Sequence, residues 1–178
     1  MNFRFFVLVL NCFICQQISA QKPSLDSTTF GKWPDLSSPK ISNNGRYSIY
    51  AVSYPVSEFP NLIIISNVAK WELVNRNIHS EANFSNDSRS AFFINTNDSL
   101  VIVSLGTSDV HYIPHIVSYQ VSPGGNSGWL AYLSSENGKL TVRGWNSNKE
   151  LEYTNTRLYQ FSNDSKSLLL VRRGIDGH

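Results

Sequence analysis

Cysteine is scarce in this chain of 178 residues, because the only two, Cys12 and Cys15, both lie within its first 20 residues. Charge is also scarce: Asp, Glu, Lys and Arg make up 16% of the chain, against about 25% in an average protein. The net charge of +2 is too small and too scattered to indicate a nucleic-acid-binding surface. Alanine, glutamate and lysine together number 19, which excludes a helical bundle or coiled coil.

Neutral turn-forming residues supply much of the polar surface, since the chain contains 26 serines and 18 asparagines. Hydrophobic residues make up 41% of the chain, and with the 10 glycines the apolar fraction lies in the normal globular range. This composition excludes general disorder. It predicts a folded protein with a real core and many turns.

The N-terminus has the layout of a secretory signal peptide. One basic residue, Arg4, precedes an apolar run at 5–10, and a polar stretch then leads to Ala20, where cleavage is expected. The alternative is a transmembrane anchor, but the apolar run is far shorter than the ~20 residues that a span requires. We therefore predict that residues 1–20 are removed and that the mature chain is exported, periplasmic or extracellular, without cysteines, disulfides or a membrane segment.

A short pattern recurs four times along the chain. Each copy has an apolar residue, a serine, a cluster of turn residues and then an apolar and aromatic run. The serines are Ser42, Ser85, Ser122 and Ser162, which lie 43, 37 and 40 residues apart. That period is close to the length of one four-stranded propeller blade.

The intervals between the serines hold further β-type runs and no long helical pattern. These runs lie at 61–65, 71–74, 100–103, 110–113, 139–145 and 151–153. The sequence therefore predicts an all-β fold, an incomplete β-propeller of about three to four blades. Residues 21–40 form a lead-in segment and residues 41–178 the partial propeller. The alternative is a β-sandwich in which four Ser-Asn hairpins recur by chance.

The turn clusters at 42–46 and 85–89 resemble the blade motif of TolB-type, WD40-like and prolyl oligopeptidase-type propellers. The segment before the first copy, with Leu25-Asp26, Phe30 and Trp33, is similar to the start of the mature chain in secreted prolyl oligopeptidase family (S9-type) serine peptidases. That resemblance implies an N-terminal propeller that restricts peptide access to a C-terminal α/β-hydrolase domain. Residues 22–178 match only the beginning of such a propeller, so none of the family's catalytic positions is present here.

The chain itself offers no catalytic, cofactor-binding or metal-ligating residues. A nucleophile elbow needs Gly-x-Ser-x-Gly, but the two candidate segments, 106–110 and 125–129, end in valine and tryptophan. His111 and His115 have a spacing that suits a metal site on a helix, but Pro114 and the β-type neighbours indicate a strand and a bend. Gly124-Gly125 lacks the lysine and helix of a phosphate-binding loop.

Four asparagines head Asn-x-Ser sequons: Asn83, Asn86, Asn97 and Asn163. In a eukaryotic secreted protein they would be candidate glycan sites, and in a bacterial protein they are simply turn residues.

Propellers use four to eight blades, whereas this chain supplies three intervals and the opening of a fourth. We therefore expect the chain to be part of a longer protein. The alternative is a small propeller that closes by pairing residues 22–40 with the last strand. The expected function is that of the non-catalytic propeller portion of an exported prolyl oligopeptidase-like peptidase. Its partners would be further blades, a hydrolase domain and a peptide substrate. The alternatives are a stand-alone TolB-like propeller that binds proteins or peptides, and a sandwich domain for adhesion or glycan binding.

Overall fold

The computed structural model describes residues 31–124, 128–144 and 149–174. The chain divides into two compact units, Met1–Trp33 and Pro34–His178, and the second unit holds the strands described below. The predicted signal peptide at 1–20 lies outside the described residues.

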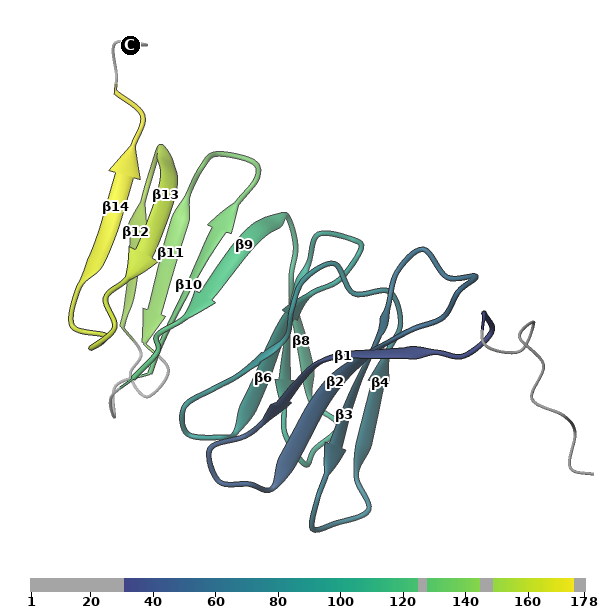
Figure 1. Cartoon of the computed structure of the whole chain (residues 1–178). Helices are drawn as coiled ribbons and strands as arrows, with labels where there is room; N and C mark the ends of the chain where they lie inside the picture. The colour runs from purple at the N-terminus through teal and green to yellow at the C-terminus, as the bar shows by residue number, and fades with distance from the viewer. Residues whose placement is uncertain (1–30, 125–127, 145–148, 175–178) are drawn as a thin grey trace, which may run out of the picture. The chain divides into compact units, whose positions relative to one another are not determined.

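The described residues form antiparallel β-strands and contain no helix, as the sequence predicted. Four sheets follow one another along the chain, and we name them blades 1 to 4 (Figure 1). Blade 1 has the strands β1 (Asp35–Ile41), β2 (Tyr47–Ser53), β3 (Asn61–Ser66) and β4 (Glu72–Asn75). Blade 2 has β5 (Asn83–Phe84), β6 (Ser90–Ile94), β7 (Leu100–Ser104) and β8 (Val110–Ile113). Blade 3 has β9 (Ile116–Val121), β10 (Trp129–Ser134), β11 (Leu140–Gly144) and β12 (Glu150–Tyr153). Blade 4 has β13 (Thr156–Phe161) and β14 (Leu168–Arg172).

Within each blade the strands pair in chain order, so the first strand always lies at one edge of its sheet. Blades 1, 2 and 3 have four strands each and blade 4 has two. Four successive sheets of this kind are the architecture of an open β-propeller, and the predicted fold class is confirmed. Among the described residues the strands form four separate sheets, and β1 and β14 lie at sheet edges without pairing with each other. The described residues therefore form neither a sandwich of two sheets nor a ring closed by pairing of residues 31–40 with the last strand.

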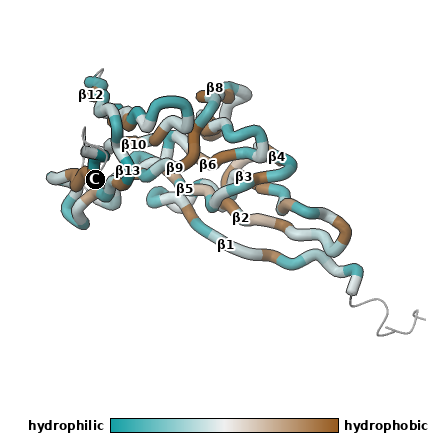
Figure 2. Tube along the Cα trace, turned by 90° about the horizontal axis from the view of Figure 1, so that it is seen from above, coloured by the Kyte–Doolittle hydropathy of each residue, from teal (hydrophilic) through white to brown (hydrophobic). Residues whose placement is uncertain are grey.

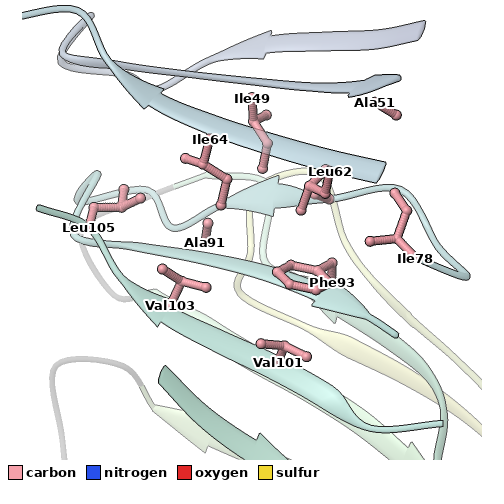
Figure 3. Packing of buried hydrophobic residues seen from close by; sticks show 11 residues of the cluster. Ile49, Ala51, Leu62, Ile64, Ile78, Ala91, Phe93, Val101, Val103 and Leu105 are labelled. Atoms are coloured by element: carbon pink, nitrogen blue, oxygen red, sulfur yellow. The ribbon is translucent and has the colours of Figure 1, made fainter. Parts of the chain in front are cut away.

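Hydrophobic clusters join each blade to the next. The first lies between blades 1 and 2, where Ile49 and Ile64 face Ala91, Phe93 and Val103 (Figure 3). A second cluster joins blade 2 to blade 3, and a third joins blade 3 to blade 4. Every residue of β6 is buried, because both faces of blade 2 are covered by neighbouring blades. Figure 2 shows the hydrophobic stretches along the strands and the more hydrophilic connections between them.

Three of the repeated serines, those of blades 1, 2 and 4, build the same turn. The Ser85 Oγ accepts the N–H of Ser90 at 2.9 Å and donates to Asp87 Oδ1 at 2.6 Å. Asp87 Oδ1 also accepts the N–H of Arg89 at 3.1 Å. The turns at Ser42 and Ser162 repeat this pattern with Asn44 and Asp164 in the place of Asp87. Serine and Asx side chains thus satisfy the turn's backbone donors, which explains the recurrence of this cluster.

The residue three positions after the serine has a left-handed backbone in these turns. Gly45 has a φ of 70°, whereas Ser88 and Ser165 have φ values of 57° and 58°. Glycine adopts this conformation without strain, but serine does so at a cost. The two serines therefore need a compensating interaction, and it comes from the preceding blade.

Blade 1 begins earlier than the sequence analysis placed it, because β1 starts at Asp35, within the predicted lead-in segment. A β-bulge between Ser37 and Lys40 shifts the register of β1 against β2. Ser38 lies within this bulge and has a φ of 52°. The β-type signal of this segment is weak because its side chains are exposed rather than alternately buried.

Blade 4 has one covered face and one exposed face. Tyr159 and Phe161 are buried against blade 3. On the opposite face, Leu158, Leu169 and Val171 are 54%, 60% and 43% exposed. In blades 1 to 3, we call the face that packs on the following blade the forward face. We use the same name for the corresponding face of blade 4, which is exposed.

Candidate functional site

A groove of about 500 Å³ runs along the first strands of blades 2, 3 and 4. These strands lie at the same edge of their respective sheets, so the groove brings together segments about 40 residues apart in the sequence. Its walls are the side chains and backbone of Asn83, Phe84, Asn86, Tyr119, Gln120, Val121, Ser122, Pro123, Gln160, Phe161 and Asn163. We call this the inner-edge groove.

None of the described side chains that line this groove is charged at neutral pH. Tyr119 is its titratable residue, and burial raises the pKa of the Tyr119 hydroxyl far above its usual range, so the group stays neutral. The remaining polar groups are primary amides, a serine hydroxyl and backbone amides, which both donate and accept hydrogen bonds. Such a surface can hold an uncharged, extended chain, but its side chains offer no group suited to proton transfer at neutral pH.

The amides in the groove also join the blades. The Gln120 Nε2 donates to the carbonyl of Tyr159 at 3.2 Å, and the Gln120 Oε1 accepts the N–H of Phe161 at 3.3 Å. In the preceding interface, the Asn83 Nδ2 donates to the Tyr119 hydroxyl at 3.0 Å. The groove is therefore built on side chains whose positions are fixed by the packing of one blade on another.

Tyr119 occupies the centre of this network. Its hydroxyl lies 2.7 Å from the carbonyl oxygens of both Glu81 and Phe92 and can donate to either of them. The Phe92 ring packs against the Tyr119 ring at a centroid distance of 6.5 Å. Tyr119 thus ties blade 3 to blade 2 and fixes the wall of the groove.

The first of the two serine segments considered as a nucleophile elbow lies in a hairpin. Residues 106–110 form the hairpin between β7 and β8, in which Thr107 Oγ1 donates to the Ser104 carbonyl at 3.0 Å and Gly106 has a φ of 79°. No helix follows Ser108 in this hairpin, so it is not a nucleophile elbow. Most of the second segment, 125–127, lies outside the described residues.

The three described histidines, His79, His111 and His115, are exposed. His111 lies in β8, and His115 has a left-handed backbone with a φ of 60°. The His115 Nε2 is 3.5 Å from Glu136 Oε1, and the His79 Nδ1 is 3.7 Å from Asp98 Oδ1. Within the described ranges, no group of three or more His, Cys, Asp or Glu side chains could hold a metal ion.

The four sequon asparagines differ in accessibility. Asn83 and Asn86 are half-buried, and their Nδ2 atoms donate to Tyr119 and to the Ser122 carbonyl. Asn97 and Asn163 are exposed in turns. Two of the sequons are thus engaged in contacts between blades.

The inner-edge groove was not predicted from the sequence. Its amides vary in type from blade to blade, so no motif marks them. The signal that could have found three of them, Asn83, Gln120 and Gln160, is their constant position two residues before the repeated serine.

Similarity to known proteins is seen among solved structures. No protein-family model and no curated protein sequence matches the chain. The crystal structure of TolB from Acinetobacter baumannii is similar to it, with a TM-score of 0.48 and 15% sequence identity. The match covers 80% of this chain and 39% of the TolB chain, so the chain spans about two fifths of that protein's length. No helix that is long and apolar enough to span a membrane occurs in the described part of the chain.

Proposed function

We propose that this chain is the non-catalytic propeller portion of an exported protein and that it binds extended peptides along the inner-edge groove. The observation that carries this proposal is the composition of the groove, an uncharged surface of amides and strand edges contributed by three consecutive blades. A peptide backbone both donates and accepts hydrogen bonds, as do the amide groups among the lining residues. Binding of this kind needs no catalytic group within the chain.

The resemblance of the segment from Leu25 to Tyr47 to the start of S9-type serine peptidases supports a more specific form of this proposal. In it, the propeller belongs to a prolyl oligopeptidase-like peptidase and controls which peptides reach a C-terminal α/β-hydrolase domain. The predicted signal peptide supports export to the periplasm or the extracellular space. Further blades, the hydrolase domain and a peptide substrate are the proposed partners.

The test uses the protein as its producing cell makes it, purified through a tag inserted after Val56, which is 98% exposed. We expect an exported species much heavier than 20.1 kDa that hydrolyses a chromogenic alanyl-prolyl peptide and is blocked by a serine-directed inhibitor. A species of 20.1 kDa or less without turnover would overturn the peptidase proposal. It would favour a stand-alone binding propeller.

The groove itself is tested by introducing a charge. Pro123 is exposed and lines the groove outside the strands, so Pro123→Asp places a carboxylate beside a bound peptide without disturbing the core. We expect KM for a neutral peptide to rise at least about threefold with kcat unchanged, because a binding contact is weakened equally in the ground and transition states. The control is Asn137→Asp, in the exposed hairpin between β10 and β11. Equal KM values for the two variants would place peptide binding elsewhere.

A further inference from the structure

The contacts between successive blades follow a common rule. In blades 1, 2 and 3, the side chain two residues before the repeated serine reaches the first strand of the next blade. We call this the pre-serine position. Lys40 Nζ donates to the Ala82 carbonyl at 2.9 Å and to Asn83 Oδ1 at 2.8 Å, and Asn83 in turn donates to Tyr119. Gln120 continues the series by bonding the backbone of β13.

A second set of contacts repeats in the turns. The backbone N–H of Asn44 donates to Ser88 Oγ at 3.1 Å, and the N–H of Gly124 donates to Ser165 Oγ at 2.8 Å. In both cases the acceptor is the left-handed serine of the next blade's turn. Asn43 and Asn86 add a third contact, since each Nδ2 donates to a backbone carbonyl in the following turn, at 3.0 and 2.9 Å.

Blade 4 repeats the same donor and acceptor set on its forward face. Gln160 is at the pre-serine position, and Asn163 and Asp164 are at the turn positions that reach forward in the earlier blades. Gln160 is directly opposite Leu169, and Leu158 is opposite Val171, so these four side chains share one face of the sheet. Gln160 is exposed, whereas Gln120 is half-buried by blade 4.

A groove of about 340 Å³ lies against this face, lined by Gln160, Phe161, Ser162, Asn163, Ser167 and Leu169. In blade 3, the equivalent forward face is covered: Gln120 is opposite Ala131, which is fully buried in the cluster shared with blade 4. The same pattern of an amide beside aliphatic side chains is therefore seen both covered, in blade 3, and uncovered, in blade 4.

We infer that the forward face of blade 4 is the docking surface of a further blade of the same repeat, and that Gln160 forms hydrogen bonds with the backbone of that blade's first strand. This inference rests on the proposed function, in which further blades are partners of the chain. The Gln160 amide accepts an N–H from the residue before the incoming serine and donates to the carbonyl two residues earlier, as Gln120 does. Asn163 and the Asp164 N–H bond the incoming turn, whose left-handed position carries a serine or threonine hydroxyl.

The surface is tested by measuring how fast a cysteine at Leu169 reacts with a maleimide. Leu169→Cys is made in a background in which Cys12 and Cys15 are serine, both in the 178-residue chain and in the polypeptide as its gene expresses it. We expect labelling to be at least tenfold slower in the native polypeptide, because an incoming blade covers the site. Val56→Cys, in an exposed loop, is the control and reacts equally fast in both forms. Equal rates at Leu169 in the two forms would overturn the inference.

The role of Gln160 is tested by comparing Gln120→Ala with Gln160→Ala. In the 178-residue chain, we expect only Gln120→Ala to lower Tm, by about 2–4 °C. In the native polypeptide, both substitutions lower Tm by similar amounts. A neutral Gln160→Ala beside a destabilising Gln120→Ala in that polypeptide would overturn the assignment. A native protein that protects Leu169 but hydrolyses no peptide retains this inference and removes the peptidase proposal.

Discussion

Replacing Ser85 by alanine removes a hydroxyl that is 4% exposed and holds the turn of blade 2 together. Its Oγ accepts N–H groups from Arg89 and Ser90 at 3.2 and 2.9 Å and donates to Asp87 at 2.6 Å. Ser90 is itself buried, so water cannot replace the lost acceptor. An unsatisfied buried donor costs about 1–3 kcal/mol, and the lost bond to a carboxylate adds to it. We expect Ser85→Ala to destabilise the chain by about 3 kcal/mol.

Ser162→Ala is the matched control. Ser162 makes the same contacts, with Asp164 and with the N–H of Ser167, but these bonds are exposed to water. Water can satisfy the freed groups, so we expect a loss of less than about 1 kcal/mol. Urea unfolding followed by tryptophan fluorescence gives both values, and at about 2–4 °C per kcal/mol Tm should separate them clearly. Equal losses for the two variants would refute the argument that burial, rather than turn chemistry, sets the cost.

Three further outcomes follow from burial and ionisation. Phe93→Ala should cost about 3–5 kcal/mol in urea unfolding, because Phe93 is fully buried between blades 1 and 2, whereas Val56→Ala should cost nothing measurable. Burial raises the pKa of the Tyr159 hydroxyl to about 12, from an ordinary value of 10.0, against the smaller opposing effect of its hydrogen bond with Ser118. The pKa of Tyr159 is higher in the folded than in the unfolded chain, so its contribution to stability is complete below pH 10 and is lost as the pH rises toward about 12. Tyr159→Phe should therefore flatten the decrease of the urea midpoint over this pH range. An unchanged slope would contradict this prediction. Leu169→Glu should reduce the fluorescence of a hydrophobic dye bound to the 178-residue chain, because it places a charge on the exposed face of blade 4. The control Val56→Glu should leave the fluorescence unchanged. Equal fluorescence in the two variants would argue that the dye binds another surface.

Much of the fold could be predicted because its determinants are local. The spacing of the serines gave the blade length, and the turn residues around Ser42, Ser85 and Ser162 bond within five residues of one another. The start of β1 was missed because its exposed side chains carry no alternation, and the bulge at Ser38 has no sequence signature. Local patterns predict a strand well only where one of its faces is buried.

The candidate site was much less predictable than the strands. The pre-serine side chains Lys40, Asn83, Gln120 and Gln160 differ in length and charge, and the first three find their partners about 40 residues away. Which of them face a groove depends on how the sheets pack, which periodicity within a blade does not encode. The relation becomes visible only when the copies are aligned on their serines.

The left-handed serines at 88 and 165 have a consequence for how this protein could be redesigned. A blade optimised alone would be given glycine at these positions, since glycine relaxes the backbone and nothing within the blade uses the hydroxyl. The hydroxyl instead accepts a backbone N–H from the preceding blade, so it stabilises the contact between the two blades. Consensus engineering of single blades would therefore remove hydrogen bonds between neighbouring blades. Libraries should instead be selected on several blades in tandem.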